Sequence, residues 1–329
     1  MHTITTRIGI AGLLAAVLPI ALPAFGQPEA KKKITIGLVA KSQSNPVFQA
    51  AYAGAKDAAR ELGKQMGVEV VIDWQTPSEE DAQKQAEAIE SLARSGAAGI
   101  SVSCSDANVV TPAIDRAVQL GAAVVCFDSD APRSKRMCYY GSDDALCGKK
   151  VMEELAKAMD EKGTVAILAG NQTAPNLQKR VQAVKEEIAR HAEMKLLPDG
   201  AVFYHAETPE QSVEAVNTAQ STHPQIQGWA MVGGWPLFTK DALRWKPGTV
   251  KVVAVDALPA QLSYLESGHV QALYAQDCYG WGYESVRLLL EKIVKKQDPK
   301  EARIIDPLTR VTKENAAEFR KKWDKWLGK

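Results

Sequence analysis

An alternation of short apolar runs and amphipathic helical segments constrains this chain more than any other feature. In the first unit, residues 34–63, an apolar run at 34–39 leads into the polar loop KSQSNP. A short run rich in β-branched residues favours a buried parallel strand. After the loop, apolar residues recur at the period of a helix with one buried face, and Gly63 is the expected stop. The unit is therefore strand, loop and helix.

The same pattern recurs in two series along the chain. Strand-like runs occur first at 68–73, 99–103, 122–127 and 137–140, and then at 164–169, 201–205, 229–232, 250–255 and 270–275. Strands that alternate with helices predict a parallel sheet covered on both faces, and two series predict two sheets. We therefore expect an α/β fold of two doubly wound, Rossmann-like lobes.

Residues 1–26 carry the pattern of a signal peptide. Arg7 precedes an apolar run at 8–22, and Ala24 and Gly26 put small residues at the first and third places before a cut. The run is short for a bilayer span, and an uncleaved anchor is the alternative. We exclude this segment from the fold and expect an exported, soluble protein cut near Gly26.

Charge and cysteine usage exclude several classes of protein. The full chain has 40 Lys and Arg residues against 39 Asp and Glu, so removal of Arg7 with the signal segment leaves a neutral chain. A neutral chain has no field that would attract nucleic acid. The 5 cysteines show no CxxC spacing, which argues against a zinc or redox site. The sequence leaves two alternatives for the cysteines: a disulfide bridge between Cys138 and Cys147, or a set of buried free thiols.

Polar and aromatic side chains gather where the predicted strands end. The carboxyl ends of parallel strands are where open α/β sheets bind ligands. These candidates are Ser42, Ser44, Asn45, Phe48, Asp128, Ser129, Asp130, Asn171, Gln172, Trp235, Asp256, Gln276 and Asp277. Carboxylates and amides bind adjacent hydroxyl groups, and an aromatic ring covers the apolar face of a sugar. The set predicts a site for a neutral polyhydroxylated ligand.

Each of these candidates also has a purely structural explanation. The Ser and Asn residues of the first loop cap a helix that Pro46 starts. Asp128 or Asp256 caps the helix that follows it, and Trp235 belongs to the core or to a contact between lobes. The joint occurrence of these residues favours the ligand site.

Five motifs in a fixed order give the chain a family resemblance. They are SNPVFQAAYAGAKDAARELG, VVCFDSD, YYGSDDALCGKKV, VVAVDALP and ALYAQDCYGWG. In this order and spacing the chain resembles the periplasmic sugar-binding proteins of ABC transporters, of the ribose-binding type. The resemblance covers residues 34 to about 311. It implies the type I periplasmic binding protein fold, two lobes joined by a three-strand hinge, with no cofactor and no metal.

The resemblance also implies roles for individual residues. Asn45, Phe48 and Asp128 are expected to contact ligand from the first lobe. Asp256 is expected to do so from the second lobe, with Gln276 close to a crossing between lobes.

Several positions depart from the family pattern. Val47 stands in place of a second aromatic residue, Ser129 and Gln178 stand where arginines are usual, and Trp235 follows a glycine where an asparagine is usual. With two arginines absent, ribose specificity is not implied. The expected ligand is a neutral monosaccharide or polyol.

The resemblance further implies interleaved lobes with crossings near 142–143, 276–278 and 306–308. The first lobe is expected at 34–142 plus 278–305, and the second at 143–276 plus 307–329. The tail is expected to form a terminal helix that docks Phe319, Trp323 and Trp326 on a lobe.

Two functions from different classes fit these expectations. The first is a monomeric periplasmic binding protein that captures a small sugar or polyol and delivers it to the membrane permease subunits of an ABC transporter. The second is a sensory binding protein that presents a sugar-like signal to a receptor. A ligand-responsive repressor would need a helix-turn-helix where this chain has its export segment. The chain has no nucleotide-binding, zinc-protease or hydrolase motif, so we expect no enzyme.

Overall fold

The computed structural model describes residues 1–6, 9, 31–198 and 200–326. The signal segment expected at 1–26 and its cut near Gly26 lie outside the described residues, apart from 1–6 and 9. Residues Lys32–Lys329 form one compact unit, to which everything below refers.

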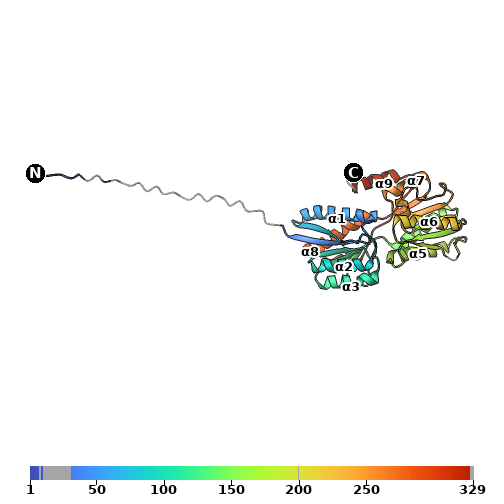
Figure 1. The fold of residues 1–329 in the computed structure, drawn as a ribbon, viewed down its shortest axis with the longest axis horizontal. Helices are drawn as coiled ribbons and strands as arrows, with labels where there is room; N and C mark the ends of the chain where they lie inside the picture. Colours follow the sequence, from blue (N-terminus) through green and yellow to red (C-terminus); the bar gives the residue numbers. More distant parts are fainter. Residues whose placement is uncertain (7–8, 10–30, 199, 327–329) are drawn as a thin grey trace. The chain divides into compact units, whose positions relative to one another are not determined.

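The first lobe is a parallel sheet with strand order β12-β5-β4-β3-β1-β2. Its strands are β1 (Lys33–Val39), β2 (Glu69–Trp74), β3 (Gly99–Val102), β4 (Ala123–Phe127), β5 (Cys138–Gly141) and β12 (Arg303–Ile305). Its helices are α1 (Pro46–Gln65), α2 (Ala82–Arg94), α3 (Ala107–Gln119) and α8 (Cys278–Lys295). Helices α1 and α8 pack together on one face of the sheet, and α2 and α3 on the other (Figure 1).

The second lobe repeats this plan with strand order β13-β11-β10-β9-β6-β7, and β8 pairs with β6. Its strands are β6 (Lys162–Ala169), β7 (Glu193–Leu196), β8 (Val202–Tyr204), β9 (Gly228–Met231), β10 (Lys251–Val255), β11 (Ala272–Ala275) and β13 (Thr309–Val311), the last antiparallel to β11. Its helices are α4 (Asp144–Ala158), α5 (Pro175–Ile188), α6 (Pro209–Thr222), α7 (Pro259–Ser267) and α9 (Ala316–Trp326), with the short 3-10 helix η1 (Trp235–Phe238).

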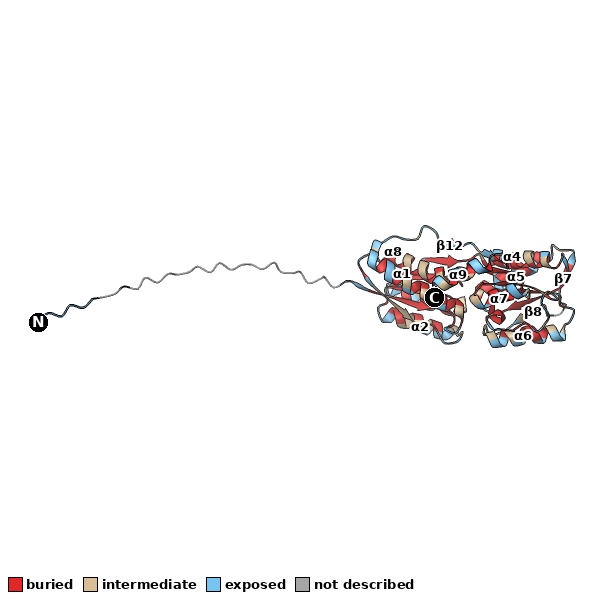
Figure 2. Ribbon diagram, turned by 90° about the horizontal axis from the view of Figure 1, so that it is seen from above, coloured by how far each residue is buried: buried red, intermediate tan, exposed pale blue. Residues whose placement is uncertain are grey.

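Buried strands and the inner faces of the helices form the core, as the red ribbon in Figure 2 shows. Two helix pairs approach so closely that only glycine fits between them. A Cβ atom on Gly282 of α8 would lie 1.7 Å from the carbonyl oxygen of Ala51 in α1. A Cβ atom on Gly148 of α4 would lie 2.1 Å from the carbonyl oxygen of Arg180 in α5. The second contact holds the backbone of α5 at Arg180 directly against α4, and Arg180 belongs to the candidate site.

The α/β class with two parallel-sheet lobes confirms the fold expected from the sequence. The structure adds three short strands, β7, β12 and β13, that the sequence pattern did not predict. Gly63 is not the helix stop, because α1 continues to Gln65 and the turn is made by Gly67, whose φ is +68°. Glycine is favoured there because it lacks the Cβ that opposes a positive φ.

The chain passes between the two sheets at three places. It leaves the first sheet after β5 and enters α4, it returns after β11 into α8, and it crosses again between β12 and β13. Cys138 and Cys147 lie on opposite sides of the first crossing and form no bridge; all five cysteines are buried free thiols. Within the described part of the chain, no helix is long and apolar enough to cross a membrane.

Candidate functional site

Two aspartates at strand ends adopt the same unusual backbone conformation. Asp128 follows β4 with φ +54°, and Asp256 follows β10 with φ +69°. This left-handed conformation is uncommon for residues other than glycine and is found where a structure over-determines it, often at functional sites. Neither residue caps a helix: α7 has Leu258 at its N-cap, and no helix directly follows Asp128. The capping explanation is therefore wrong for both.

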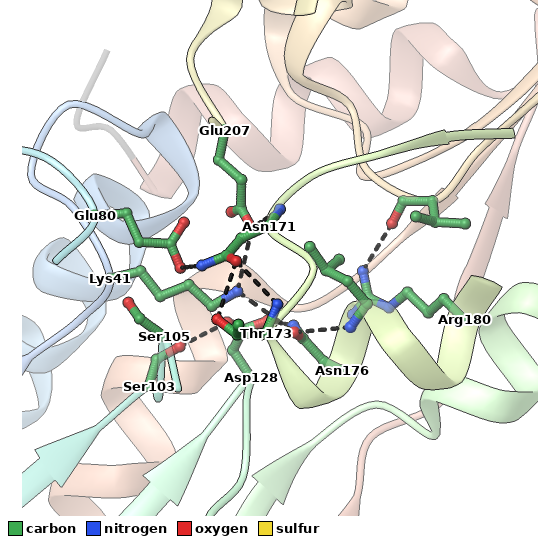
Figure 3. Close-up of polar contacts among 12 residues, drawn as sticks. Lys41, Glu80, Ser103, Ser105, Asp128, Asn171, Thr173, Asn176, Arg180 and Glu207 are labelled. Atoms are coloured by element: carbon green, nitrogen blue, oxygen red, sulfur yellow. Dashed lines mark hydrogen bonds and ion pairs between the residues drawn. The ribbon is translucent and has the colours of Figure 1, made fainter. Parts of the chain in front are cut away.

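The carboxylate of Asp128 joins the two lobes. It is 5 % exposed and accepts from Ser103 Oγ at 2.6 Å and from Asn176 Nδ2 at 3.1 Å. Ser103 follows β3 in the first lobe, whereas Asn176 lies in the first turn of α5 in the second. Figure 3 shows these side chains converging between the lobes. Strand ends of the first sheet and a helix of the second lobe thus meet at one polar cluster.

A buried arginine organises the second lobe's half of the cluster. Arg180 of α5 donates from Nε to Asp144 Oδ1 at 3.0 Å, from Nη2 to Gln276 Oε1 at 2.7 Å and from Nη1 to the carbonyl of Val232 at 3.2 Å. Gln276 in turn donates to Asp256 Oδ1 at 2.8 Å. Arg180 therefore fixes the amide of Gln276, and that amide orients the strand-end carboxylate.

An ion pair crosses between the lobes beside Asp128. Lys41 lies two residues after the end of β1, and Glu207 lies in the loop after β8. Lys41 Nζ is 3.6 Å from Glu207 Oε1, and both side chains are buried. Lys41 also donates to Asn176 Oδ1 at 3.4 Å. Farther out, Asn171 Nδ2 donates to Glu80 Oε1 at 3.2 Å, again from the second lobe to the first. Among the residues that the structure describes, four polar contacts connect the lobes at this cluster.

Burial and neighbouring charges shift the pKa values of this pair. Burial acts to lower the pKa of Lys41, but the carboxylates of Glu207, Glu80 and Asp128 outweigh it, and the pKa is raised. Burial raises the pKa of Glu207 to about 7, a shift that Lys41 opposes and Glu80 reinforces. Lys41 is therefore charged at neutral pH, and Glu207 titrates near neutrality.

The two second-lobe aspartates are also perturbed. Burial raises the pKa of Asp256, against the hydrogen bond from Gln276 and the charge of Arg180. Burial likewise raises the pKa of Asp144, against Arg180. Carboxylates held in a buried site and aimed between two lobes accept strong hydrogen bonds from hydroxyl groups.

A cavity of about 430 Å³ opens next to the outer edge of this cluster, with walls from both lobes. Its lining includes Glu80, Asn171, Tyr204 and His205. Burial lowers the pKa of His205 to about 4, so this imidazole is neutral at neutral pH. Polar and aromatic side chains thus line the cavity beside the interlobe contact of Asn171 with Glu80.

The structure brings three of the nine predicted site residues into the polar cluster: Asp128 in the hydrogen bonds around Asn176, and Asp256 and Gln276 in those around Arg180. Ser44 is exposed and makes no contact with it. Asn45 caps α1, accepting from the Val47 N–H at 3.2 Å, as the structural alternative predicted. Phe48 packs edge-on against Phe127, with ring centroids 6.5 Å apart, as part of the first lobe's core.

The remaining three predicted residues, Ser129, Trp235 and Gln178, make none of the hydrogen bonds of the cluster. Ser129 is fully buried beside Asp128, and its hydroxyl has no hydrogen-bond partner. Trp235 is buried in the second lobe, where its ring packs edge-on against His205 at 4.8 Å. Gln178 is exposed and donates to the carbonyl of Gln172, so it does not face the cluster. A buried arginine of the cluster, Arg180, lies two residues after Gln178.

Sequence reasoning missed most of the residues that form the polar cluster. These are Lys41, Glu80, Ser103, Asp144, Asn176, Arg180 and Glu207. Lys41, Ser103 and Glu207 follow or end predicted strands, so the strand-end rule applied to every polar residue would have found them. Asn176 and Arg180 lie four residues apart on one face of α5, and only the orientation of that helix reveals their role.

Comparison with known proteins agrees with this geometry. Residues 36–297 match the model of the periplasmic binding protein domain family. With its two lobes and the polar cluster between them, the chain belongs to that family of binding proteins.

Individual curated proteins and solved structures are also similar to this chain. The chain is 26% identical to the ribose import binding protein of Escherichia coli over 80% of this chain and 86% of the relative. It is 27% identical to the D-ribose/D-allose-binding protein of Pseudomonas aeruginosa, over 81% and 86%. An ABC transporter solute-binding protein from Burkholderia graminis, solved with D-arabinose, matches with a TM-score of 0.79 and 28% identity, over 87% of this chain and 98% of that one.

Proposed function

We propose that this chain is the periplasmic solute-binding protein of an ABC transporter, which captures a neutral monosaccharide or polyol between its lobes and delivers it to a membrane permease. The observation that carries the proposal is the pair of buried carboxylates, Asp128 and Asp256, that the two lobes aim at the same interlobe cluster. Such carboxylates accept hydrogen bonds from adjacent hydroxyl groups of a sugar.

The charges of the cluster support a ligand without negative charge. Among the residues that the structure describes, its two cations already face protein carboxylates: Lys41 pairs with Glu207, and Arg180 pairs with Asp144. An anionic sugar would therefore meet Asp128 and Asp256 without a cation left to compensate it, and like charges in a buried site disfavour each other. A neutral ligand avoids this cost.

We propose that the residues contacting the ligand are Asp128, Asp256, Gln276, Asn176, Arg180 and Lys41, with Phe48, Ser129 and Trp235 in the supporting walls. Direct contacts such as the one from Asn176 to Asp128 occupy the space between the lobes, so ligand entry would replace them with contacts to hydroxyl groups. Ser44, Asn45 and Gln178 are proposed as structural or surface residues.

We further propose that the three passages between sheets, near 142–143, 276–278 and 306–308, act as the hinge on which the lobes open. A ligand that bridges Asp128 and Asp256 would favour the closed arrangement because it binds both lobes only there. The protein is proposed to be an exported monomer, cut near Gly26.

A thermal-shift screen of monosaccharides, alditols, cyclitols, sugar acids and amino acids tests the proposal. A neutral sugar or polyol present at 100 times its Kd should stabilise the protein by about 2.7 kcal/mol and raise Tm by a few degrees. Calorimetry on the best ligand then gives its Kd. If only amino acids or sugar acids raise Tm, the proposed ligand class is wrong.

Transport and sensing share this pocket and differ in the membrane partner. The names of the curated relatives, which are import binding proteins, favour transport. Capture of the ligand-loaded protein's partners from membranes of the native host separates the two: permease subunits support the proposal, and a sensory receptor supports the alternative.

A further inference from the structure

The C-terminal helix α9 connects the two lobes at a place remote from the polar cluster. It follows β13 and is held to the second lobe by Trp323, whose Nε1 donates to the Ala257 carbonyl at 2.8 Å. Arg320 adds an ion pair to Glu266 of α7 at 3.0 Å. The aromatic stripe expected from the sequence therefore docks as predicted, with Trp323 only 2 % exposed.

The last described turn of α9 reaches the first lobe. There the ring of Trp326 stacks on the ring of Tyr279, with centroids 5.4 Å apart and planes 3° from parallel. Trp323 supports Trp326 edge-on at 5.2 Å, and the ammonium of Lys322 lies 5.4 Å from the Trp326 ring centre. Trp326 is thus positioned by its own helix, whereas the surface it meets belongs to the other lobe.

Tyr279 is fixed to the first lobe. It lies in the first turn of α8, immediately after the chain's second passage between sheets. Its hydroxyl donates to Asp57 Oδ2 of α1 at 2.8 Å, and its carbonyl lies 2.1 Å from where Gly54 would carry a Cβ. Because α1 and α8 are packed this closely, Tyr279 moves with the first lobe as one body.

We propose that Trp326 and Tyr279 form an interlobe strap that stabilises the closed arrangement and so sets ligand affinity without touching the ligand. The strap and the contact from Asn176 to Asp128 occur in the same lobe arrangement. In the proposal, rotation of one lobe about the three passages separates both contacts. Only residues 36–297 match the family model, so α9 lies beyond the matched region. The effect on affinity rests on the proposed function, whereas the effect on lobe opening does not.

The test measures the distance between lobes in the ligand-free protein. Cysteines placed at the exposed residues Lys84 of α2 and Lys185 of α5 can be spin-labelled selectively, because the five native cysteines are buried. In Trp326→Ala, the distance distribution between the labels should shift towards longer distances. Tyr279→Leu should produce the same shift from the other lobe, with α9 intact.

Matched variants separate the strap from simple loss of structure. Trp326→Phe and Tyr279→Phe keep an aromatic pair and should keep the distribution of the unmodified chain. Lys325→Ala changes an exposed residue of the same turn and should also leave it unchanged. Circular dichroism and Tm verify that each variant is folded.

Ligand affinity provides the second readout. An aromatic pair of this kind corresponds to about a two- to tenfold change in an equilibrium constant. We expect Kd of the ligand found in the screen to rise by about that factor in Trp326→Ala. Unchanged label distances in both Trp326→Ala and Tyr279→Leu overturn the strap. Failure of every sugar to bind, with the distances shifted, overturns the proposed ligand and leaves the strap intact.

Discussion

The side-chain amide of Asn176 donates to Asp128 Oδ1 at 3.1 Å, so a helix of the second lobe directly contacts the carboxylate that the first lobe presents. Both side chains are buried, and Lys41 reaches the same amide from the first lobe at 3.4 Å. The two sheets thus share one polar cluster although they have separate strands.

Replacing either strand-end carboxylate should weaken ligand binding. Asp128→Ala and Asp256→Ala each remove charge-assisted hydrogen bonds of about 1.5 to 3 kcal/mol apiece, which corresponds to a roughly ten- to several-hundred-fold rise in Kd. Calorimetry with the ligand from the screen measures it. Asp106→Ala is the control, because Asp106 caps α3 and accepts from the Asn108 N–H at 2.8 Å. It should lower stability by about 1 kcal/mol without changing Kd.

Removing Arg180 should strongly destabilise the second lobe. Arg180→Met leaves Asp144 buried and uncompensated, a situation that costs about 3 to 5 kcal/mol. Asp144→Asn in the same chain should recover part of this loss, because the buried charge is then gone. Urea unfolding of the single and double variants measures both effects. Arg287→Met, which breaks half-exposed pairs with Glu284 and Glu291, should cost at most about 1 kcal/mol.

Glu207 should make stability fall as pH rises towards neutrality. Its pKa is about 7 in the folded protein, against an ordinary value of 4.5. The folded state therefore holds a proton that the unfolded state loses, so this contribution is fully present below pH 4.5 and is lost as pH rises through about 7. The difference amounts to about 2 to 4 kcal/mol. In Glu207→Gln this part of the pH dependence should disappear, as measured by Tm from pH 4.5 to 8.

Glu154 is a control, because its contribution to stability should change with pH in the opposite direction. The hydrogen bond from Arg310 lowers its pKa, so its contribution is present above its ordinary pKa and is lost as pH falls. Glu154→Gln should therefore change Tm at neutral pH and lose that effect in acid. If Glu207→Gln instead leaves the profile between pH 4.5 and 8 unchanged, Glu207 does not hold the proton.

The close contact of α1 and α8 should not tolerate a methyl group. Gly282→Ala would place a Cβ 1.7 Å from the Ala51 carbonyl oxygen, a backbone atom that moves only with its helix. Forced repacking of this kind costs about 1 to 3 kcal/mol or more. Chemical denaturation measures it. Ser285→Ala in the same helix removes a buried hydroxyl that has no hydrogen-bond partner, so stability should be unchanged or higher.

Much of the architecture follows from local pattern. Apolar runs such as the one at 34–39 become buried strands, and the polar residues after them fall at the carboxyl ends of the sheets, because parallel connections impose that arrangement. The strand-end rule therefore predicts Asp128, Asp256 and Gln276 as members of one site. The short strands β7, β12 and β13 were not predicted, because each mixes charged with apolar residues and lies mostly outside the core, so none shows a continuous apolar run.

The local sequence pattern specifies which residues lie at strand ends, whereas the packing of the two lobes selects which of these residues meet. Asn45 and Phe48 share the loop and helix after β1 with Lys41, yet Asn45 caps α1, Phe48 enters the core, and only Lys41 enters the cluster. The pairing of Lys41 with Glu207 joins residues of two sheets, and no local pattern specifies it. Such a contact depends on the rigid placement of whole lobes, which results from packing that is summed over the entire chain.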